Sequence, residues 1–211
     1  QPDVRLSFGP GDSRTTFNNA WCIAANGNVV HVVYYDYLYT TAEIFYKRST
    51  DSGLSWGGDK RLTNNTADSK TPSIAVAGSV VHVVWREESG EVGIYYTRST
   101  NGGNSFEGIT RLTNTNAISY YPSVTVSGSN LRVVWEDLRD GNREIYYKRS
   151  TNDGTTWGAD TRLTNNTFDS RFPSIKVSGT AAQFRATKGF RASTGLSMTF
   201  QILLACMSPS V

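Results

Sequence analysis

The chain has 211 residues, a formal net charge of +3, 12% aromatic residues and 18% charged residues. This composition is too aromatic and too weakly charged for a disordered protein, and the length allows a buried core. The apolar runs are rich in Val, Thr, Ile, Tyr and Trp and are separated by Gly, Asn, Asp and Ser, which predicts strands joined by turns. Lys and Arg recur at fixed places in a repeat, which argues against nucleic-acid binding.

The N-terminal segment is similar to a strand that recurs later in the chain. Residues 4–7 (Val-Arg-Leu-Ser) match residues 60–63 (Lys-Arg-Leu-Thr), and residues 11–14 match residues 67–70 in the same phase. We therefore expect residues 4–8 to form the last strand of a repeat unit whose other strands lie elsewhere in the chain.

The chain begins at a Gln without an initiating Met, which favours removal of a leader and a secreted or cell-surface protein. The longest apolar run near the end, residues 202–207, is too short to span a bilayer, so we expect no membrane span.

Four motifs return in phase along the chain, with steps of 50 residues from Arg61 to Arg111 and 51 residues from Arg111 to Arg162. Such a period is the sequence signature of a repeat architecture. The matching segments are 31–34, 82–85 and 132–135; 43–48, 93–98 and 144–149; 61–63, 111–113 and 162–164; and 71–74, 121–124 and 172–175.

Each unit contains four short β-prone runs, which in the second unit are about 73–77, 80–85, 92–98 and 106–112. The second run is nearly all apolar, so both faces of its sheet must be covered. Four-stranded sheets stacked around an axis satisfy this condition, and no segment has a sustained helical period. The sequence predicts an all-β fold: a small β-propeller of four-stranded antiparallel blades, about four per chain, in a single domain of residues 1–211.

A turn of the pattern Ser-x-Asp/Asn-x-Gly-x-x-Trp/Phe joins the third and fourth runs of each unit. The Asx side chain can accept hydrogen bonds from backbone N–H groups, Gly allows an unusual backbone conformation, and the aromatic ring anchors the hairpin. The predicted structural residues are Ser49, Asp51, Gly53 and Trp56; Ser99, Asn101, Gly103 and Phe106; and Ser150, Asn152, Gly154 and Trp157.

This turn resembles the Asp-box, or bacterial neuraminidase repeat, of sialidase-like β-propellers, and the resemblance covers residues 6 to about 179. Two of the three copies carry Asn where the family usually has Asp. In the family the Asp-box is a structural hairpin on the side away from the active site. The resemblance therefore implies a propeller and says little about chemistry.

The units span about 20–62, 73–112 and 122–163, and a degenerate fourth unit spans 172–211. After Gly179 the repeat is lost, although 182–187 and 196–206 are still strand-like. We expect residues 4–8 to complete the fourth unit and close the ring, which removes a free sheet edge. Pairing of two chains into a larger ring is a second way to close it, and a truncated or frame-shifted parent gene would also explain the altered tail.

If the blades run in this order, the loops between second and third strands share one face with the loops that join successive units. Carboxylates, arginines and tyrosines on this face suit a polar ligand such as a sugar, because rings can stack on sugar faces and charged groups can bind hydroxyls. The candidate ligand-binding residues are Tyr35, Asp36, Tyr37, Arg86, Glu87, Glu136, Asp137, Arg139, Tyr120 and Arg171.

The resemblance also implies a comparison with catalytic sialidases, which have six blades in one chain. They use an arginine triad for the substrate carboxylate, a Tyr nucleophile assisted by Glu, and an Asp acid/base. Arg171, with the Phe and Pro that follow it, is similar to the Arg-x-Pro element of the family, but here it is one version of a repeated Lys/Arg/Tyr-x-Pro position. No nucleophile pair stands out, so the sequence assigns no catalytic residue.

No metal or cofactor is expected. His31 and His82 occupy one repeat position that holds Arg132 in the third unit, which is typical of strand packing and not of a metal ligand. Cys22 and Cys206 have no metal-ligand spacing. They would be neighbours in a closed ring, where both a disulfide and two packed thiols remain open.

Three functions are compatible with these patterns: a non-catalytic, lectin-like glycan-binding propeller, a protein-interaction scaffold, and a sialidase-like glycoside hydrolase. Fold alone does not separate them. The first is favoured, with a glycan or glycoprotein as the partner, and with a second copy of the chain as a partner if the ring is completed between chains.

Overall fold

The structure, a computed structural model, describes residues 6–7, 12–16, 21–37, 40–88, 92–178, 181–188 and 198–204. These residues form four antiparallel sheets, and none of them lies in a helix. Each sheet is made of strands that are consecutive in the sequence. Three of the sheets have four strands and the fourth has three, in agreement with the predicted all-β repeat.

The strands have the following bounds. The first sheet contains β1 (Ile23–Asn26), β2 (Val29–Asp36), β3 (Glu43–Ser49) and β4 (Lys60–Arg61); the second contains β5 (Ser69–Ala77), β6 (Val80–Glu87), β7 (Gly93–Ser99) and β8 (Thr110–Arg111). The third contains β9 (Ser119–Ser127), β10 (Asn130–Asp137), β11 (Glu144–Ser150) and β12 (Thr161–Arg162); the fourth contains β13 (Ser170–Ser178), β14 (Ala181–Lys188) and β15 (Met198–Leu204).

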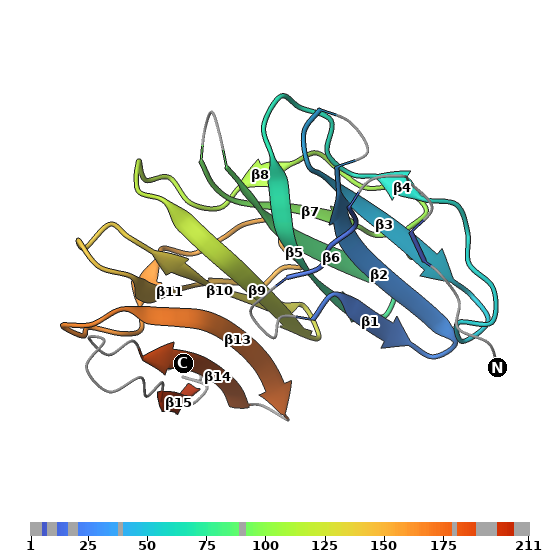
Figure 1. The fold of residues 1–211 in the computed structure, drawn as a ribbon. Helices are drawn as coiled ribbons and strands as arrows, with labels where there is room; N and C mark the ends of the chain where they lie inside the picture. Colours follow the sequence, from blue (N-terminus) through green and yellow to red (C-terminus); the bar gives the residue numbers. More distant parts are fainter. Residues whose placement is uncertain are drawn as a thin grey trace.

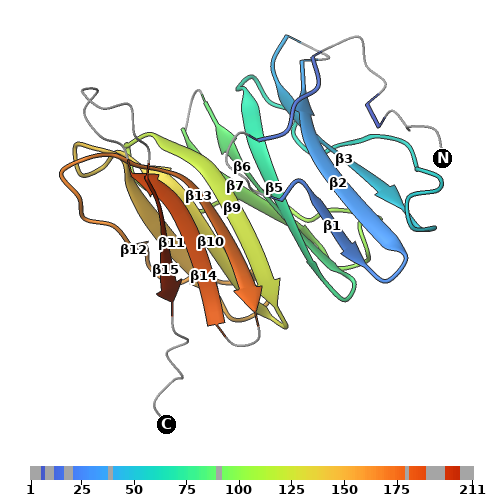
Figure 2. The ribbon, with the colours of Figure 1, turned by 60° about the horizontal axis from the view of Figure 1, so that its bottom comes forward.

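The four sheets stand side by side in chain order and form an arc, with the first and fourth sheets at its two ends (Figures 1 and 2). The first strands of neighbouring sheets contact one another, β1 with β5, β5 with β9, and β9 with β13. The opposite edge of each complete sheet is a two-residue strand. This order places the first strands together along one side of the arc.

Alternate residues of each second strand face the two neighbouring sheets, because side chains on a strand point to opposite faces in turn. Val83 packs with Ile74 against Val33 of the first sheet, and Val84 packs against Val133 of the third sheet. All five side chains are buried. The second strand is therefore covered on both faces, as its continuous apolar run predicts.

The short fourth strand of the first sheet is attached through the Arg-Leu-Thr motif. The Leu62 backbone N–H donates to the Ile44 carbonyl at 2.8 Å, and the Thr63 hydroxyl accepts from the Ile44 N–H at 2.9 Å. Arg61 forms a 2.7 Å ion pair with the buried Glu43. The motif is thus structural. The third sheet repeats these contacts with Leu163, Ile145, Thr164, Arg162 and Glu144.

The hairpins 49–56, 99–106 and 150–157, here called the box hairpins, share one hydrogen-bond pattern. The Ser49 hydroxyl accepts from the Gly53 N–H at 2.8 Å, and Asp51 Oδ1 accepts from the Ser49 hydroxyl at 2.6 Å and the Ser55 N–H at 2.8 Å. An Asn side-chain oxygen can accept the same bonds, which explains Asn at this position elsewhere. The equivalent residues are Ser99, Asn101, Gly103 and Ser105, and Ser150, Asn152, Gly154 and Thr156.

Each later box hairpin packs on a tyrosine of the preceding sheet. The Tyr46 hydroxyl fills the space that a Cβ at Gly103 would occupy, and the Tyr46 ring meets Phe106 edge-on at 4.9 Å. His31 Nδ1 lies 2.7 Å from the same hydroxyl. We call this contact the tyrosine–glycine latch. The second and third sheets form it with Tyr96, Gly154, Trp157 and His82.

We predict that Gly103→Ala destabilises the fold far more than Gly128→Ala. Both glycines have a positive φ (84° and 55°), but only the Cβ at position 103 would overlap Tyr46, because the Cβ at 128 meets open space. The backbone term alone costs about 1–2 kcal/mol. Chemical denaturation should therefore show about that loss for Gly128→Ala and a clearly larger loss for Gly103→Ala. Equal losses would contradict the latch.

The two buried histidines should make the free energy of unfolding fall as the pH is lowered. Burial, reinforced by the charges of Arg48 and Arg98, lowers the pKa of His31 to about 4 and of His82 to about 3. The unfolded chain takes up protons below about pH 6.5 and the folded chain does not, so stability falls from there toward pH 4, by at most about 1.4 kcal/mol per pH unit for each residue.

We predict that His82→Gln flattens this slope, as measured by unfolding at several pH values. The fourth sheet has Gln183 at the position equivalent to His82. Gln183 pairs with Lys176 on the neighbouring strand, just as His82 pairs with Ala75, so a glutamine suits this strand position. An unchanged slope would show that His82 is protonated in the folded chain.

Leu6 lies against the outer face of the first sheet. It packs with Val32, Tyr34 and Phe45, and its carbonyl accepts a 2.8 Å hydrogen bond from Lys47 Nζ. In the third sheet the equivalent lysine binds the carbonyl of the Leu that follows β8 in the preceding sheet. Leu6 thus lies where the last strand of a preceding sheet would lie. The other residues of 4–8 except Ser7 are outside the described part, so their pairing with the fourth unit stays a prediction.

The fourth sheet packs on the third with one face and carries charges on the other. Ile175 and Phe184 are buried against Val134. On the other face Lys176 and Arg185 are exposed. The equivalent residues of the second sheet, Ala75 and Val84, are buried. The lost sequence repeat thus corresponds to an outer face that is no longer apolar.

Cys22 is half-buried at the start of the first sheet. Its thiol lies 3.2 Å from the Pro72 carbonyl, and burial raises its pKa to about 11. The other cysteine, Cys206, lies outside the described residues, so the question of a disulfide stays open.

Candidate ligand-binding site

The candidate site lies at the ends of the strands opposite the box hairpins. Here β5, β9 and β13 each contain a one-residue bulge, at which Thr71, Tyr121 and Phe172 have φ values of 51°, 48° and 52°. Such left-handed residues are strained when they are not Gly. The bulge sets a new register beyond it, so that Lys70 stands opposite Arg86 and Tyr120 opposite Glu136.

One strand position near this end breaks the repeat. Tyr35, Arg86 and Glu136 occupy equivalent places, each paired with an isoleucine of the next strand. The residue that follows each of these three is an acid, and the residue two places before each of them is a buried valine. A change of chemical character between conserved neighbours in a repeat is typical of a site with a specific task.

Tyr120 is the centre of the cluster. The Arg86 guanidinium lies 4.0 Å from the centroid of its ring, and the Arg143 guanidinium lies 4.8 Å away. Arg143 is also 3.7 Å from Glu136, measured from Nε to Oε2. Two cations on one aromatic ring form a cation–π arrangement that joins the second and third sheets.

Ion pairs extend the cluster toward the first sheet. Lys70 Nζ lies 2.7 Å from Asp68 and 2.8 Å from Glu88, and Glu88 also binds Arg86 at 2.7 Å. The same Lys70 ammonium is 5.2 Å from the centroid of the Tyr37 ring, which is 38% exposed. An aromatic surface open to solvent thus lies next to paired charges.

On the other side, the cluster reaches the fourth sheet. Asp169 accepts a 3.0 Å hydrogen bond from the backbone N–H of Arg143 and forms a 2.5 Å ion pair with the Arg171 guanidinium. The side chain of Arg171 is 40% exposed. In the bulged strands, the Tyr121 and Phe172 rings lie 5.1 Å apart, measured between their centroids. Residues from all four sheets therefore contribute to one polar and aromatic surface.

Glu136 is the buried acid of the cluster. Its side chain is fully buried, and Oε1 accepts a 2.6 Å hydrogen bond from the Phe172 N–H while Oε2 has no hydrogen-bond partner. Burial raises the pKa of Glu136 to about 7, although the Phe172 N–H, Arg143 and Arg171 oppose this shift. Glu136 therefore changes charge near neutral pH.

We predict that Glu136→Gln gains stability relative to the unchanged protein as pH rises from about 4.5 to 7. In this range the unfolded chain has lost the Glu136 proton and the folded chain has kept it, so the acid costs increasing stability with rising pH, about 1.4 kcal/mol per unit at most. Gln stays neutral and can still accept from Phe172. Unfolding curves of both proteins across this range provide the measurement, and a constant difference would contradict the raised pKa.

Four of the predicted ligand-binding residues have partners within the fold. The buried acids Asp36, Glu87 and Asp137 close the ends of β2, β6 and β10. Arg139 binds Asp137 at 2.7 Å and Asp160 at 2.8 Å. These residues hold strands together. The donors to the three acids include Ser13 for the first, Ser69, Trp85 and Asn65 for the second, and Ser119 and Trp135 for the third.

The structure brings the other candidates to the cluster. Tyr37, Arg86, Tyr120, Glu136 and Arg171 belong to it directly, as described above. Tyr35 is 3% exposed and contacts the Tyr37 ring edge-on at 6.0 Å, so it supports the exposed ring from below.

Arg143 was not among the sequence candidates, yet it connects Tyr120, Glu136 and Asp169. The repeat contains the signal that could have revealed it, because its position holds Ala42 in the first unit and a valine in the second. Lys70 and Glu88 were also not among them. In the described part of the chain, no three His, Cys, Asp or Glu residues are arranged to hold a metal ion. No helix there is suited to crossing a membrane.

No protein-family model and no curated protein sequence matches the chain. Solved structures do match it. Penicillium chrysogenum α-L-arabinanase complexed with arabinobiose is 12% identical, with a TM-score of 0.65 over 92% of this chain and 67% of that one. Trypanosoma rangeli sialidase in complex with the inhibitor DANA is 13% identical, with a TM-score of 0.63 over 89% and 36%. The GH32 β-fructofuranosidase BmSUC1 of Bombyx mori is 13% identical, with a TM-score of 0.57 over 92% and 46%.

The chain has a β-propeller fold. At these identities the likeness concerns the fold alone, and the chain spans about a third of the length of the Trypanosoma rangeli sialidase. The matched structures bear the names of an arabinanase, a sialidase and a β-fructofuranosidase.

Proposed function

We propose that this chain is a lectin-like propeller that binds a carbohydrate, without cleaving it, through the cluster around Tyr120. One observation carries the proposal: Tyr35, Arg86 and Glu136 replace one another at a single repeat position while their neighbours keep their character. A purely structural repeat has no need of that exchange. Here the exchange gives each blade a different support for the surface residues, because Tyr35 contacts Tyr37, Arg86 lies on Tyr120 and Glu136 pairs with Arg143.

The cluster offers the groups that recognise sugars. The exposed Tyr37 ring provides an apolar face for stacking, and the half-buried Tyr120 ring holds the two arginines beside it. Arg171 and Arg86 provide donors for hydroxyl or carboxylate groups, and Glu88 and Asp169 provide acceptors. Because the charges are already paired with one another, their orientation is fixed before a ligand arrives, which lowers the entropic cost of binding.

The contacts of the acids favour binding over hydrolysis. Glycosidases of the common type use two carboxyl groups that flank the scissile bond. Glu136 is fully buried and is bonded to the Phe172 N–H. The accessible acids of the described cluster are ion-paired, namely Asp68, Glu88 and Asp169. A carboxyl group that is both protonated near neutral pH and open to a substrate is absent from the described residues of the cluster.

We predict that Tyr120→Ala and Arg143→Ala each weaken glycan binding about tenfold, which corresponds to about 1.4 kcal/mol. The first removes the ring that holds Arg86 and Arg143, and the second removes the cation that contacts Tyr120 and Glu136. Arg185→Ala is the matched control, because it removes an exposed cation from the fourth sheet. A glycan array would identify the ligand, and calorimetry with the unchanged protein and the three variants would give affinities.

Thermal unfolding of each variant separates lost binding from lost folding. If no glycan binds the unchanged protein at millimolar concentration, or if the control loses as much affinity as the two cluster variants, the carbohydrate proposal fails and the protein-interaction scaffold replaces it.

A glycoside hydrolase is the second candidate, favoured by the raised pKa of Glu136, since general acids need a pKa near the working pH. Turnover of a fluorogenic sialoside or arabinoside that is abolished by Glu136→Gln would establish it. The lectin proposal includes a glycoprotein partner and a secreted or cell-surface location, because the glycans of glycoproteins are displayed outside the cell.

A further inference from the structure

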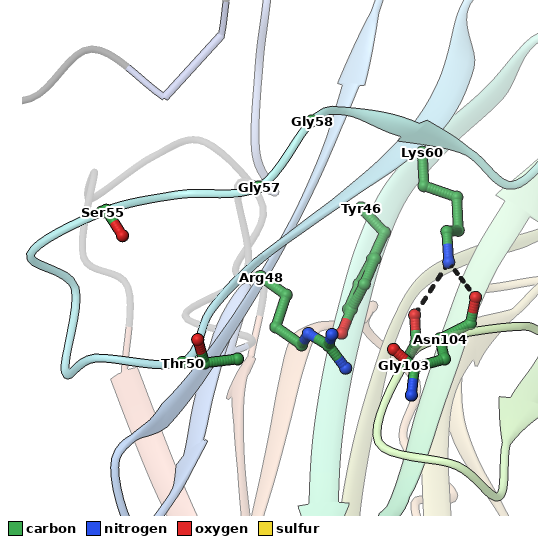
Figure 3. Close-up of a pocket in the computed structure, with 9 residues that line it drawn as sticks. All are labelled: Tyr46, Arg48, Thr50, Ser55, Gly57, Gly58, Lys60, Gly103 and Asn104. Carbon is green, nitrogen blue, oxygen red and sulfur yellow. Dashed lines mark hydrogen bonds between the residues drawn. The ribbon is translucent and has the colours of Figure 1, made fainter.

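A pocket of about 280 Å³ lies between the first and second box hairpins, at the strand ends opposite the Tyr120 cluster. Figure 3 shows Arg48 and Lys60 extending into it toward the backbone of Gly103 and Asn104. Lys60 Nζ donates to the Gly103 carbonyl at 2.9 Å and also to the Asn104 carbonyl, and Arg48 Nη1 donates to the Gly102 carbonyl at 2.5 Å. The two cations thus hold the second hairpin against the first.

The partners of these two cations in the described part of the chain are backbone carbonyls and, for Lys60, the Phe106 ring, whose centroid lies 5.9 Å away. Neither forms an ion pair with an acid of the described residues. Burial, together with the nearby charge of Arg48, lowers the pKa of Lys60. The one acid within the first hairpin, Asp51, accepts bonds from Ser49 and Ser55 and does not line the pocket. Like charges that share a pocket without a counter-charge are costly, and an anion would relieve the cost.

The next pair of hairpins provides an internal comparison. There Arg98, the equivalent of Arg48, donates to the Asp153 carbonyl and forms a 2.7 Å ion pair with Glu107. The first hairpin has Gly57 at the position of Glu107, and Lys60 stands where the second has a threonine. The second interface thus carries one cation, Arg98, with the acids Glu107 and Asp153, whereas the first carries two cations and has Gly102 in place of Asp153. The substitutions remove an internal counter-ion and add a cation at the same interface.

The substitutions also open space. Gly57 and Gly58 line the pocket without side chains, and a Cβ at Gly58 would meet no atom within 4 Å. Arg48 uses one nitrogen on the Gly102 carbonyl, which leaves further N–H donors of its planar guanidinium. Guanidinium groups bind sulfate and phosphate in a bidentate manner, and a lysine adds a point charge.

We propose that the pocket between the first and second box hairpins binds a sulfate or phosphate group, held by Arg48 and Lys60 in the place that the Glu107 carboxylate takes beside Arg98. This oxyanion site is separate from the proposed carbohydrate site, because it lies at the other end of the strands. It rests on Gly57, which stands where the second unit has Glu107, and on Lys60, which stands where both other units have a threonine. It does not depend on the lectin function.

The test is a titration of the whole chain with inorganic sulfate and with inorganic phosphate at constant ionic strength, followed by the backbone amide signals of the two hairpins. We expect saturable shifts around Gly57, Gly58 and Asn104, and the tighter of the two ions identifies the oxyanion that the pocket prefers. Lys60→Thr, which introduces the residue of the other two hairpins, should weaken binding at least about tenfold. Lys176→Thr, which removes an exposed lysine from the fourth sheet, should leave it unchanged.

Two further variants exchange the properties of the hairpins. Gly57→Glu should abolish binding by supplying the internal acid, and a Cβ there lies 3.4 Å from its nearest neighbour, the Arg48 carbonyl, so the fold tolerates it. Glu107→Gly combined with Thr110→Lys should create a second site beside Arg98. Unshifted signals elsewhere show that each variant is folded. The proposal is overturned if the unchanged protein shows no saturable shifts, or if Lys60→Thr and Gly57→Glu bind as well as Lys176→Thr.

Discussion

The tyrosine–glycine latch is the contact on which the arrangement of the sheets depends. Tyr46 and Tyr96 are each 2% exposed, and each ends against the glycine of the next box hairpin, where no Cβ fits. The latch couples a local requirement, a glycine with positive φ in a tight turn, to a long-range one, the approach of two sheets. One residue type therefore satisfies the hairpin and the interface together, which explains why the motif recurs with a fixed period.

Because the latch and the valine layers hold the sheets, the strand ends are free to differ. At the end opposite the box hairpins, the bulged strands place unlike residues from successive units at equivalent points, and Tyr120 collects two arginines. At the box hairpins, Gly57 and Lys60 change the charge of one interface without altering the latch. Both candidate sites are thus local departures from a repeat whose packing is maintained elsewhere.

Much of the candidate site could be predicted from the sequence, because the repeat assigns each loop to a face. Tyr37, Arg86, Tyr120, Glu136 and Arg171 were identified in this way. The sequence could not show which acids the fold itself uses. The side chains of Asp36, Glu87 and Asp137 are bound by serines that lie 18 to 23 residues away, and only the sheet register brings those partners together.

The sequence by itself determined the repeat, the four-stranded units and the box hairpins, since these follow from apolar periodicity and turn chemistry within a few residues. Only the tertiary structure decided the position of Leu6 beside the first sheet, the charged outer face of the fourth sheet and the role of Arg143. Each of these depends on contacts between different sheets. The physical reason is that a strand's alternation fixes which residues share a face, whereas the neighbour that covers the face is set by packing across the molecule.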